Sequence, residues 1–116
     1  MRQAGVIAAA GLVALERMVD RLAEDHANAR ALAGALAGLP GLAIDLATVQ
    51  TNIVIVRVEG PAGATRTAEL VRGCAVRKVK VHAIGPTSIR CVTHKDVDGD
   101  DIGRAVDAVR EITARW

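Results

Sequence analysis

The stretch SIRCVTHKDV, residues 88–97, decides the fold that this sequence predicts. Successive side chains of a strand point to opposite faces, so Arg90, Val92 and His94 are expected to share one face. The intervening Ile, Cys and Thr would then face the other side. An arginine on a strand can meet a carboxylate with two parallel hydrogen bonds. One face of the predicted sheet therefore carries a group that can bind an acid.

Three further segments predict strands near this one. Residues 52–58 are apolar on both faces, which is typical of a strand covered on each side. Residues 42–45 form a weaker candidate. Residues 78–83 would be joined to a strand over 89–94 through the turn signal Gly85-Pro86. These strands predict a small sheet.

Two helical segments precede the strands, within residues 2–38. Residues 4–15 carry no polar side chain, which suits a helix buried on several sides. From about residue 20, apolar residues recur with helical spacing, and Glu24, Asp25 and Arg30 are expected on the opposite side. The first helix therefore needs a partner surface, and the second is an amphipathic surface helix.

Two more helices follow, one over residues 65–72 and one after Asp96. Acidic residues in the first turn of the last helix favour it through the helix dipole. Together with the strands, these helices predict an open α/β layer. The second face of strand 52–58 and the apolar first helix both require surface that the predicted elements do not supply. The apolar stripe of the last helix consists of Ile102, Val106, Val109, Thr113 and Trp116.

The composition favours one ordinary globular domain. A chain of 116 residues can bury a sizeable core. Trp116 is its only aromatic residue and the net charge is only +2, so nucleic-acid binding is disfavoured. The local basic cluster at residues 77–80 is expected to guard an exposed strand edge. The apolar run near the start is shorter than the roughly 20 residues of a membrane span, and no signal-peptide cleavage site follows it.

The cysteines and histidines show no metal-ligand spacing. Cys74 and Cys91 are too far apart for a Cys-x-x-Cys redox pair and too few for a disulfide framework. The three histidines have no Asp or Glu spaced with them as a metal-binding helix requires. We therefore expect a cytoplasmic protein that binds no metal.

Read together with the opening MRQAG, residues 88–97 resemble the C-terminal part of the low-specificity threonine aldolases, which are pyridoxal-phosphate lyases of fold-type I. The likeness runs from Met1 to Trp116. It implies an α/β fold, the small C-terminal domain of such an enzyme, with a small, mostly antiparallel sheet and helices on one face. Residues 1–38 would be the helical segment leading into this domain, and residues 41–116 would form it. The large cofactor-binding domain would not be contained in this chain.

The resemblance also implies the site residues. In the aldolases the arginine of this motif holds the substrate's carboxylate, which assigns substrate binding to Arg90; pairing with an acid at a sheet edge is the alternative. Arg2 is the candidate for binding the cofactor phosphate, because it stands at a helix start, although a terminal arginine is often only solvated. The family's cofactor lysine lies upstream of the MRQAG element. Lys78, Lys80 and Lys95 do not resemble it in context, so no catalytic residue is assigned here.

The implied function is cleavage of threonine or allo-threonine to glycine and acetaldehyde by a pyridoxal-phosphate enzyme of which this chain is a part. Such an enzyme would be a homo-oligomer, a tetramer or a dimer, without nucleic-acid or membrane partners, and this chain would be inactive alone. Two alternatives remain. The chain could be a stand-alone α/β module that binds an amino acid through Arg90. It could also be an oligomerisation module that assembles through its apolar first helix.

Overall fold

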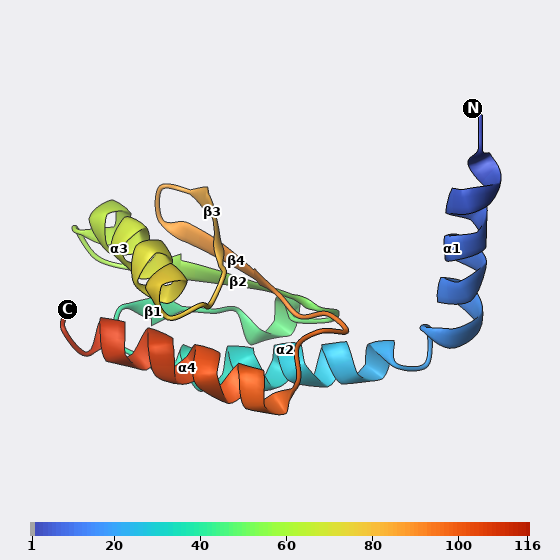
Figure 1. The fold of residues 1–116 in the computed structure, drawn as a ribbon. Coiled ribbons are helices and arrows are strands. Elements are labelled where there is room, and N and C mark those ends of the chain that lie inside the picture. Colours follow the sequence, from blue (N-terminus) through green and yellow to red (C-terminus); the bar gives the residue numbers. More distant parts are fainter. Residues whose placement is uncertain (1) are drawn as a thin grey trace.

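The computed structural model describes residues 2–116. Within these residues lie four α-helices, four strands and one short 3-10 helix, and Figure 1 shows their arrangement. In chain order the elements are α1 (Ala4–Arg17), α2 (Leu22–Ala37), β1 (Leu42–Ala43), η1 (Leu46–Thr48), β2 (Ile53–Val58), α3 (Gly63–Val76), β3 (His82–Gly85), β4 (Ser88–Val92) and α4 (Gly99–Thr113).

The strands form one antiparallel sheet in the order β1-β2-β4-β3. The register places Val54 opposite Cys91 and Val56 opposite Ile89, and all four are buried. Helices α2 and α3 contact β2, while α4 packs against α2 and α3 (Figure 1). This arrangement confirms the predicted α/β class, with a small antiparallel sheet and helices on one face.

Helix α4 begins with a capping box, which adds hydrogen bonds to the favourable helix dipole expected from the sequence. The Asp98 carboxylate accepts a hydrogen bond from the backbone N–H of Asp101, and the Asp101 carboxylate accepts one from the N–H of Asp98. Its stripe, from Ile102 to Thr113, is buried as predicted. The prediction was wrong for Trp116, which lies beyond the helix. Its ring still packs against the buried core, and the Arg66 guanidinium lies over it, 5.2 Å from the ring centroid.

The two first helices differ in their surroundings. Helix α1 stands away from the sheet and from α2–α4 (Figure 1), and none of its residues is buried. The partner surface that its apolar sequence requires is thus not supplied by the residues described. Helix α2 buries its apolar side, but the prediction that Asp25 faces solvent was wrong. Asp25 is 3% exposed, and its carboxylate accepts two hydrogen bonds from Arg21, at 2.7 and 3.0 Å.

The structure at and after α3 differs from the prediction in two ways, the length of the helix and the start of the next strand. Helix α3 extends beyond the predicted 65–72 at both ends, and the predicted strand over 78–83 begins only at His82. The cause is a Schellman motif at the end of α3. The N–H of Lys78 donates to the Ala75 carbonyl, and the N–H of Val79 donates to the Cys74 carbonyl. The basic cluster 77–80 is therefore a helix exit and a loop, not a strand edge.

Candidate functional site

The face of the sheet turned away from the helices is not covered by any part of residues 2–116. Strand β2 alternates exposed and buried residues along its length, and β4 does so from Ile89 onward. We call the exposed side chains the open sheet face. Its members are Ile53, Ile55 and Arg57 on β2, His82 on β3, and Arg90 and Val92 on β4.

Arg90 lies on this face in β4, which has β2 on one side and β3 on the other. Ile55 is its register partner on β2, and His82 is its partner on β3. None of the four strands contains an aspartate or glutamate, and within residues 2–116 the Arg90 guanidinium forms no salt bridge. The alternative that Arg90 pairs with an acid at the sheet edge therefore has no support among the described residues. Its hydrogen-bond donors are available to a ligand.

Two further basic or titratable residues share the open sheet face, and the sequence reading assigned neither a role. His82 is directly opposite Arg90, at the roughly 5 Å Cβ separation of cross-strand neighbours. Arg57 is diagonal to Arg90, since its register partner is Ser88. Alternation along their own strands could have indicated which face each residue lies on. It could not show that they lie beside Arg90 until the pairing of the strands was known. The open face is thus basic and apolar, which suits an acidic ligand.

The end of β4 beyond Arg90 is fixed by Thr93, which is 1% exposed. Its hydroxyl donates to the Asp25 carbonyl at 2.7 Å. Its backbone N–H donates to the Asn52 carbonyl at 2.9 Å, and the Asn52 side chain donates to the Thr93 carbonyl at 2.8 Å. These bonds join β4 to both β2 and α2. Thr93, three residues after Arg90, therefore anchors the end of the strand that carries Arg90.

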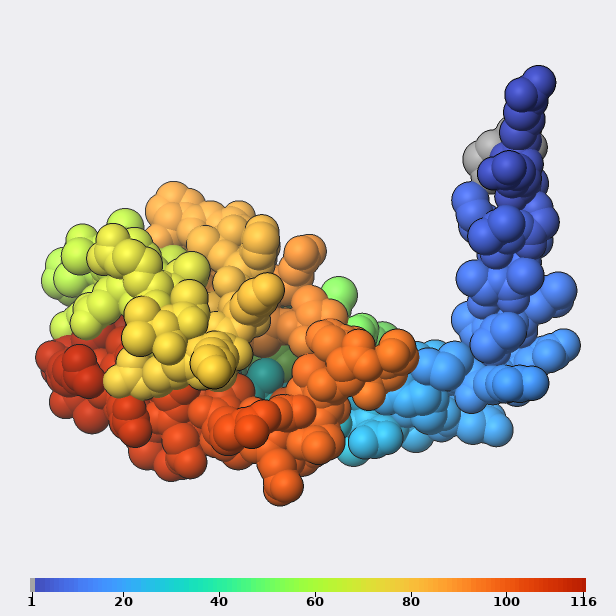
Figure 2. All heavy atoms as spheres, viewed as in Figure 1, coloured from blue at the N-terminus to red at the C-terminus, as the bar shows by residue number. Residues whose placement is uncertain are grey.

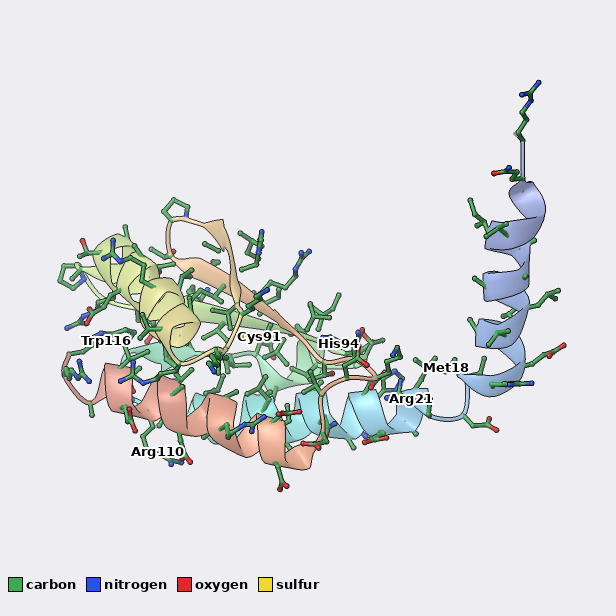
Figure 3. The ribbon with its side chains drawn as sticks, in the orientation of Figure 1. Met18, Arg21, Cys91, His94, Arg110 and Trp116 are labelled. Atoms are coloured by element: carbon green, nitrogen blue, oxygen red, sulfur yellow. The ribbon has the colours of Figure 1, made fainter. Side chains whose placement is uncertain are left out.

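His94 was expected on the same face as Arg90, but β4 ends at Val92 before reaching it. His94 instead lines a cavity on the helix side of the sheet. Its Nδ1 accepts a hydrogen bond from the Asp96 backbone N–H at 3.3 Å, so it satisfies a backbone group. In Figure 3 it is labelled near the turn that leads toward α4.

Arg2 lies at the opposite end of the molecule. It is exposed and precedes the first turn of α1, whose N-terminus is far from the sheet in Figure 1. The structure does not bring Arg2 and Arg90 together within this chain.

No lysine accompanies Arg90 on the open sheet face. Lys78 and Lys80 lie in the loop after α3, and the Lys95 ammonium is 2.8 Å from the Asp96 carboxylate. Within residues 2–116, therefore, no lysine is placed to hold a cofactor beside Arg90. The same residues contain no group of three His, Cys, Asp or Glu side chains that could bind a metal. No helix among them has the length and apolarity needed to cross a membrane.

Both cysteines are free thiols on the covered side of the sheet. Burial raises the pKa of Cys91 to about 12 and also raises the pKa of Cys74. A thiol with a raised pKa is a poor nucleophile at neutral pH. Neither cysteine is therefore suited to covalent chemistry.

Comparison with known proteins adds independent information. The family model of the beta-eliminating lyases matches residues 1–59. The low specificity L-threonine aldolase of Escherichia coli K12 is 35% identical over 116 residues, which is 100% of this chain and 30% of that protein. Low-specificity L-threonine aldolase 1 of Arabidopsis thaliana is 35% identical over 103 residues, which cover 88% of this chain and 28% of that protein. The chain thus spans less than a third of the length of these relatives.

Among solved structures, a mutant of C-DES with glycine covalently linked to its PLP cofactor has a similar fold. The TM-score is 0.66 at 19% sequence identity, over 79% of this chain and 24% of that one. At this identity the likeness concerns the fold alone. It agrees with the small α/β domain predicted from the sequence.

Proposed function

This chain belongs to the beta-eliminating lyase family, and from that premise we propose that it is the C-terminal domain of a pyridoxal-phosphate-dependent threonine aldolase. The proposed reaction is cleavage of threonine or allo-threonine to glycine and acetaldehyde. The longer protein in which this chain would work is called the complete lyase below. The observation that carries the proposal is the unpaired Arg90 on the open sheet face, in a chain similar over its full length to low specificity L-threonine aldolases.

In this proposal Arg90 binds the carboxylate of the amino-acid substrate. The guanidinium offers two parallel donors to one carboxylate, and such charge-assisted bonds contribute about 1.5 to 3 kcal/mol each. The apolar neighbours Ile55 and Val92 would exclude water when another surface covers the open face, which strengthens the interaction. The contribution of Arg90 is therefore to fix one end of the substrate.

The described residues do not fit the role of holding the cofactor, because no lysine shares the face of Arg90. We propose that the lysine is supplied by another part of the complete lyase, and that Arg2 contacts the cofactor phosphate across a subunit boundary. The expected result is that this chain alone, mixed with pyridoxal phosphate and threonine, releases no acetaldehyde.

Substitution of Arg90 in the complete lyase tests the proposal. Arg90→Lys keeps the charge but removes the two-pronged geometry. We expect the KM for threonine to rise by about 10- to 100-fold, which corresponds to one charge-assisted hydrogen bond, while cofactor absorbance stays unchanged. The matched control is Arg30→Lys, on the exposed side of α2. An unchanged KM in Arg90→Lys would remove Arg90 from the site.

Helix α1 supports a second element of the proposal, assembly into a homo-oligomer. Val6, Ile7 and Leu15 are 73%, 64% and 71% exposed, although their side chains are apolar. We infer that this helix is covered in the complete lyase by its other domain or by a second subunit, in a dimer or tetramer located in the cytoplasm. A purely structural oligomerisation module would also use α1. That reading predicts that Arg90→Lys changes no ligand affinity, which the kinetic test above decides.

A further inference from the structure

The helix side of the molecule contains a cavity of about 530 Å³ that the proposed function does not use. Its floor is apolar and comes from α2, α4 and β4, with Leu32, Leu36, Cys91, Ile102 and Val109 among its lining residues. In Figure 2 the teal atoms of α2 are visible at the bottom of a hollow between the yellow 77–81 segment and the orange segment before α4. The volume lies within the range of small-molecule sites, roughly 300–1,000 Å³.

The rim of this cavity has an excess of positive charge. Four cationic and two anionic side chains line it, and each anionic one already has a partner. Asp96 pairs with Lys95, and Asp101 pairs with Arg104. On the rim Arg77 pairs with Glu111 at 3.0 Å. The cations left without an acidic partner within residues 2–116 are Lys78 and Lys80.

Lys78 occupies a position that favours glycine. It is the left-handed residue of the Schellman motif that ends α3, with a φ of 61°. A side chain at positive φ is strained, and such strain is often found where a residue contacts a ligand. Here the conformation places a residue with an ammonium group at the rim of the cavity, where glycine would have suited the backbone better.

We propose that this cavity binds an amphiphilic anion, with a medium-length apolar body on the floor and a single anionic head group at Lys78 and Lys80. The apolar floor has no fixed donors that would recognise a polar body, and the two free ammonium groups provide the charge complement. The cavity is on the opposite side of the sheet from Arg90. Its ligand is therefore separate from the amino acid proposed for the open sheet face.

Octanoate is the probe, titrated into the 116-residue chain and followed by amide NMR. We expect saturable shifts at Val79, Val81, Val97 and Ala105, which line the cavity, and none at α1. Octan-1-ol, which lacks the charge, should bind more weakly by about fivefold or more. Equal affinity for octanol, shifts that spread over the open sheet face, or no saturation at millimolar concentrations would each overturn the proposal.

Substitutions at Lys78 separate binding from folding. Lys78→Gly should raise the urea midpoint, because it relieves the strained backbone, and at the same time weaken octanoate binding by about fivefold. A structural role alone would move the midpoint without changing the affinity, and that result would contradict the proposal. Lys80→Ala should weaken binding similarly without a rise in midpoint. Arg72→Ala, which removes an exposed cation outside the cavity without disturbing a salt bridge of residues 2–116, is the control and should bind octanoate normally.

Discussion

Both faces of the sheet carry aliphatic residues, but the surroundings of the two faces are opposite. Val54, Val56 and Ile89 on the helix side are at most 2% exposed. On the other side, Ile55 and Val92 are 40% and 45% exposed. Because side chains alternate along a strand, neighbouring residues of one strand belong to different faces.

Apolar character alone therefore does not mark the core of this chain. The helix side is closed by α2 and α3 with α4 packed across them, so it determines the fold. The open side carries Arg57, His82 and Arg90 among apolar neighbours, and these three side chains are exposed. We interpret the open side as a functional surface that another part of the complete lyase covers.

The largest expected effect comes from placing a charge on each face in turn. Val54→Asp buries a carboxylate without a partner and should reduce the free energy of unfolding by about 4 kcal/mol or more. Ile55→Asp, the adjacent residue on the open side, should cost about 1 kcal/mol or less. Urea denaturation of this chain measures both. Similar losses in the two variants would mean that the open face is part of the folding core.

A smaller loss of stability is expected at Thr93, the buried residue just after β4. Thr93→Val removes the hydrogen bond from the hydroxyl to the Asp25 carbonyl and should cost about 1 to 2 kcal/mol. The adjacent residue, Val92, points to the open side. The reverse substitution there, Val92→Thr, should change the free energy of unfolding by no more than about 0.5 kcal/mol. If the two changes cost the same, the network around Thr93 does not fix the end of β4.

The effect that is smallest at neutral pH is the titration of a buried thiol, which lowers the free energy of unfolding only in alkaline solution. Because burial raises the pKa of Cys91 from 9.0 to about 12, the folded state retains a proton that the unfolded state loses above pH 9. Stability should be insensitive to this thiol below pH 9 and then fall by about 1.4 kcal/mol per pH unit until about pH 12. Cys74, whose pKa is also raised, adds to the fall.

In Cys91→Ala the decrease in the free energy of unfolding with pH should lose the part that Cys91 contributes. Urea denaturation at a series of pH values between 8 and about 10.5 measures this change. Val92→Cys is the matched control, because it adds a thiol on the open side that is solvated in both states. This control should leave the slope unchanged. A slope that persists in full in Cys91→Ala would assign the pH dependence to other groups.

The sequence predicted the sheet and the position of Arg90 well because both depend on local alternation. The prediction of a strand directly after α3 was wrong. Alternation in residues 78–81 is typical of a strand, but the Schellman motif at Lys78 ends the helix and a loop follows it. The sequence prediction also ended α3 too early. Gly73 lies within the helix, where a Cβ would approach the Ile112 side chain to 2.6 Å, so the glycine serves close packing of α3 on α4.

Other features depended on contacts that local patterns do not contain. The pairing of Asp25 with Arg21 and the placement of Trp116 beneath Arg66 involve tertiary packing or a helix end. The apolar residues of β2 predicted that both faces need cover, which stays a prediction for the open face. They could not indicate that the helices of this chain would cover only one of them.

The most direct test of the division between the faces is the rate of thiol labelling in Val92→Cys. In this chain the new cysteine should react rapidly at pH 8, while the buried Cys74 and Cys91 react slowly. In the complete lyase the same cysteine should react on the order of tenfold more slowly, because another surface covers the open sheet face. Equal rates in the two proteins would show that this face remains exposed in the complete lyase, so that no other surface covers it.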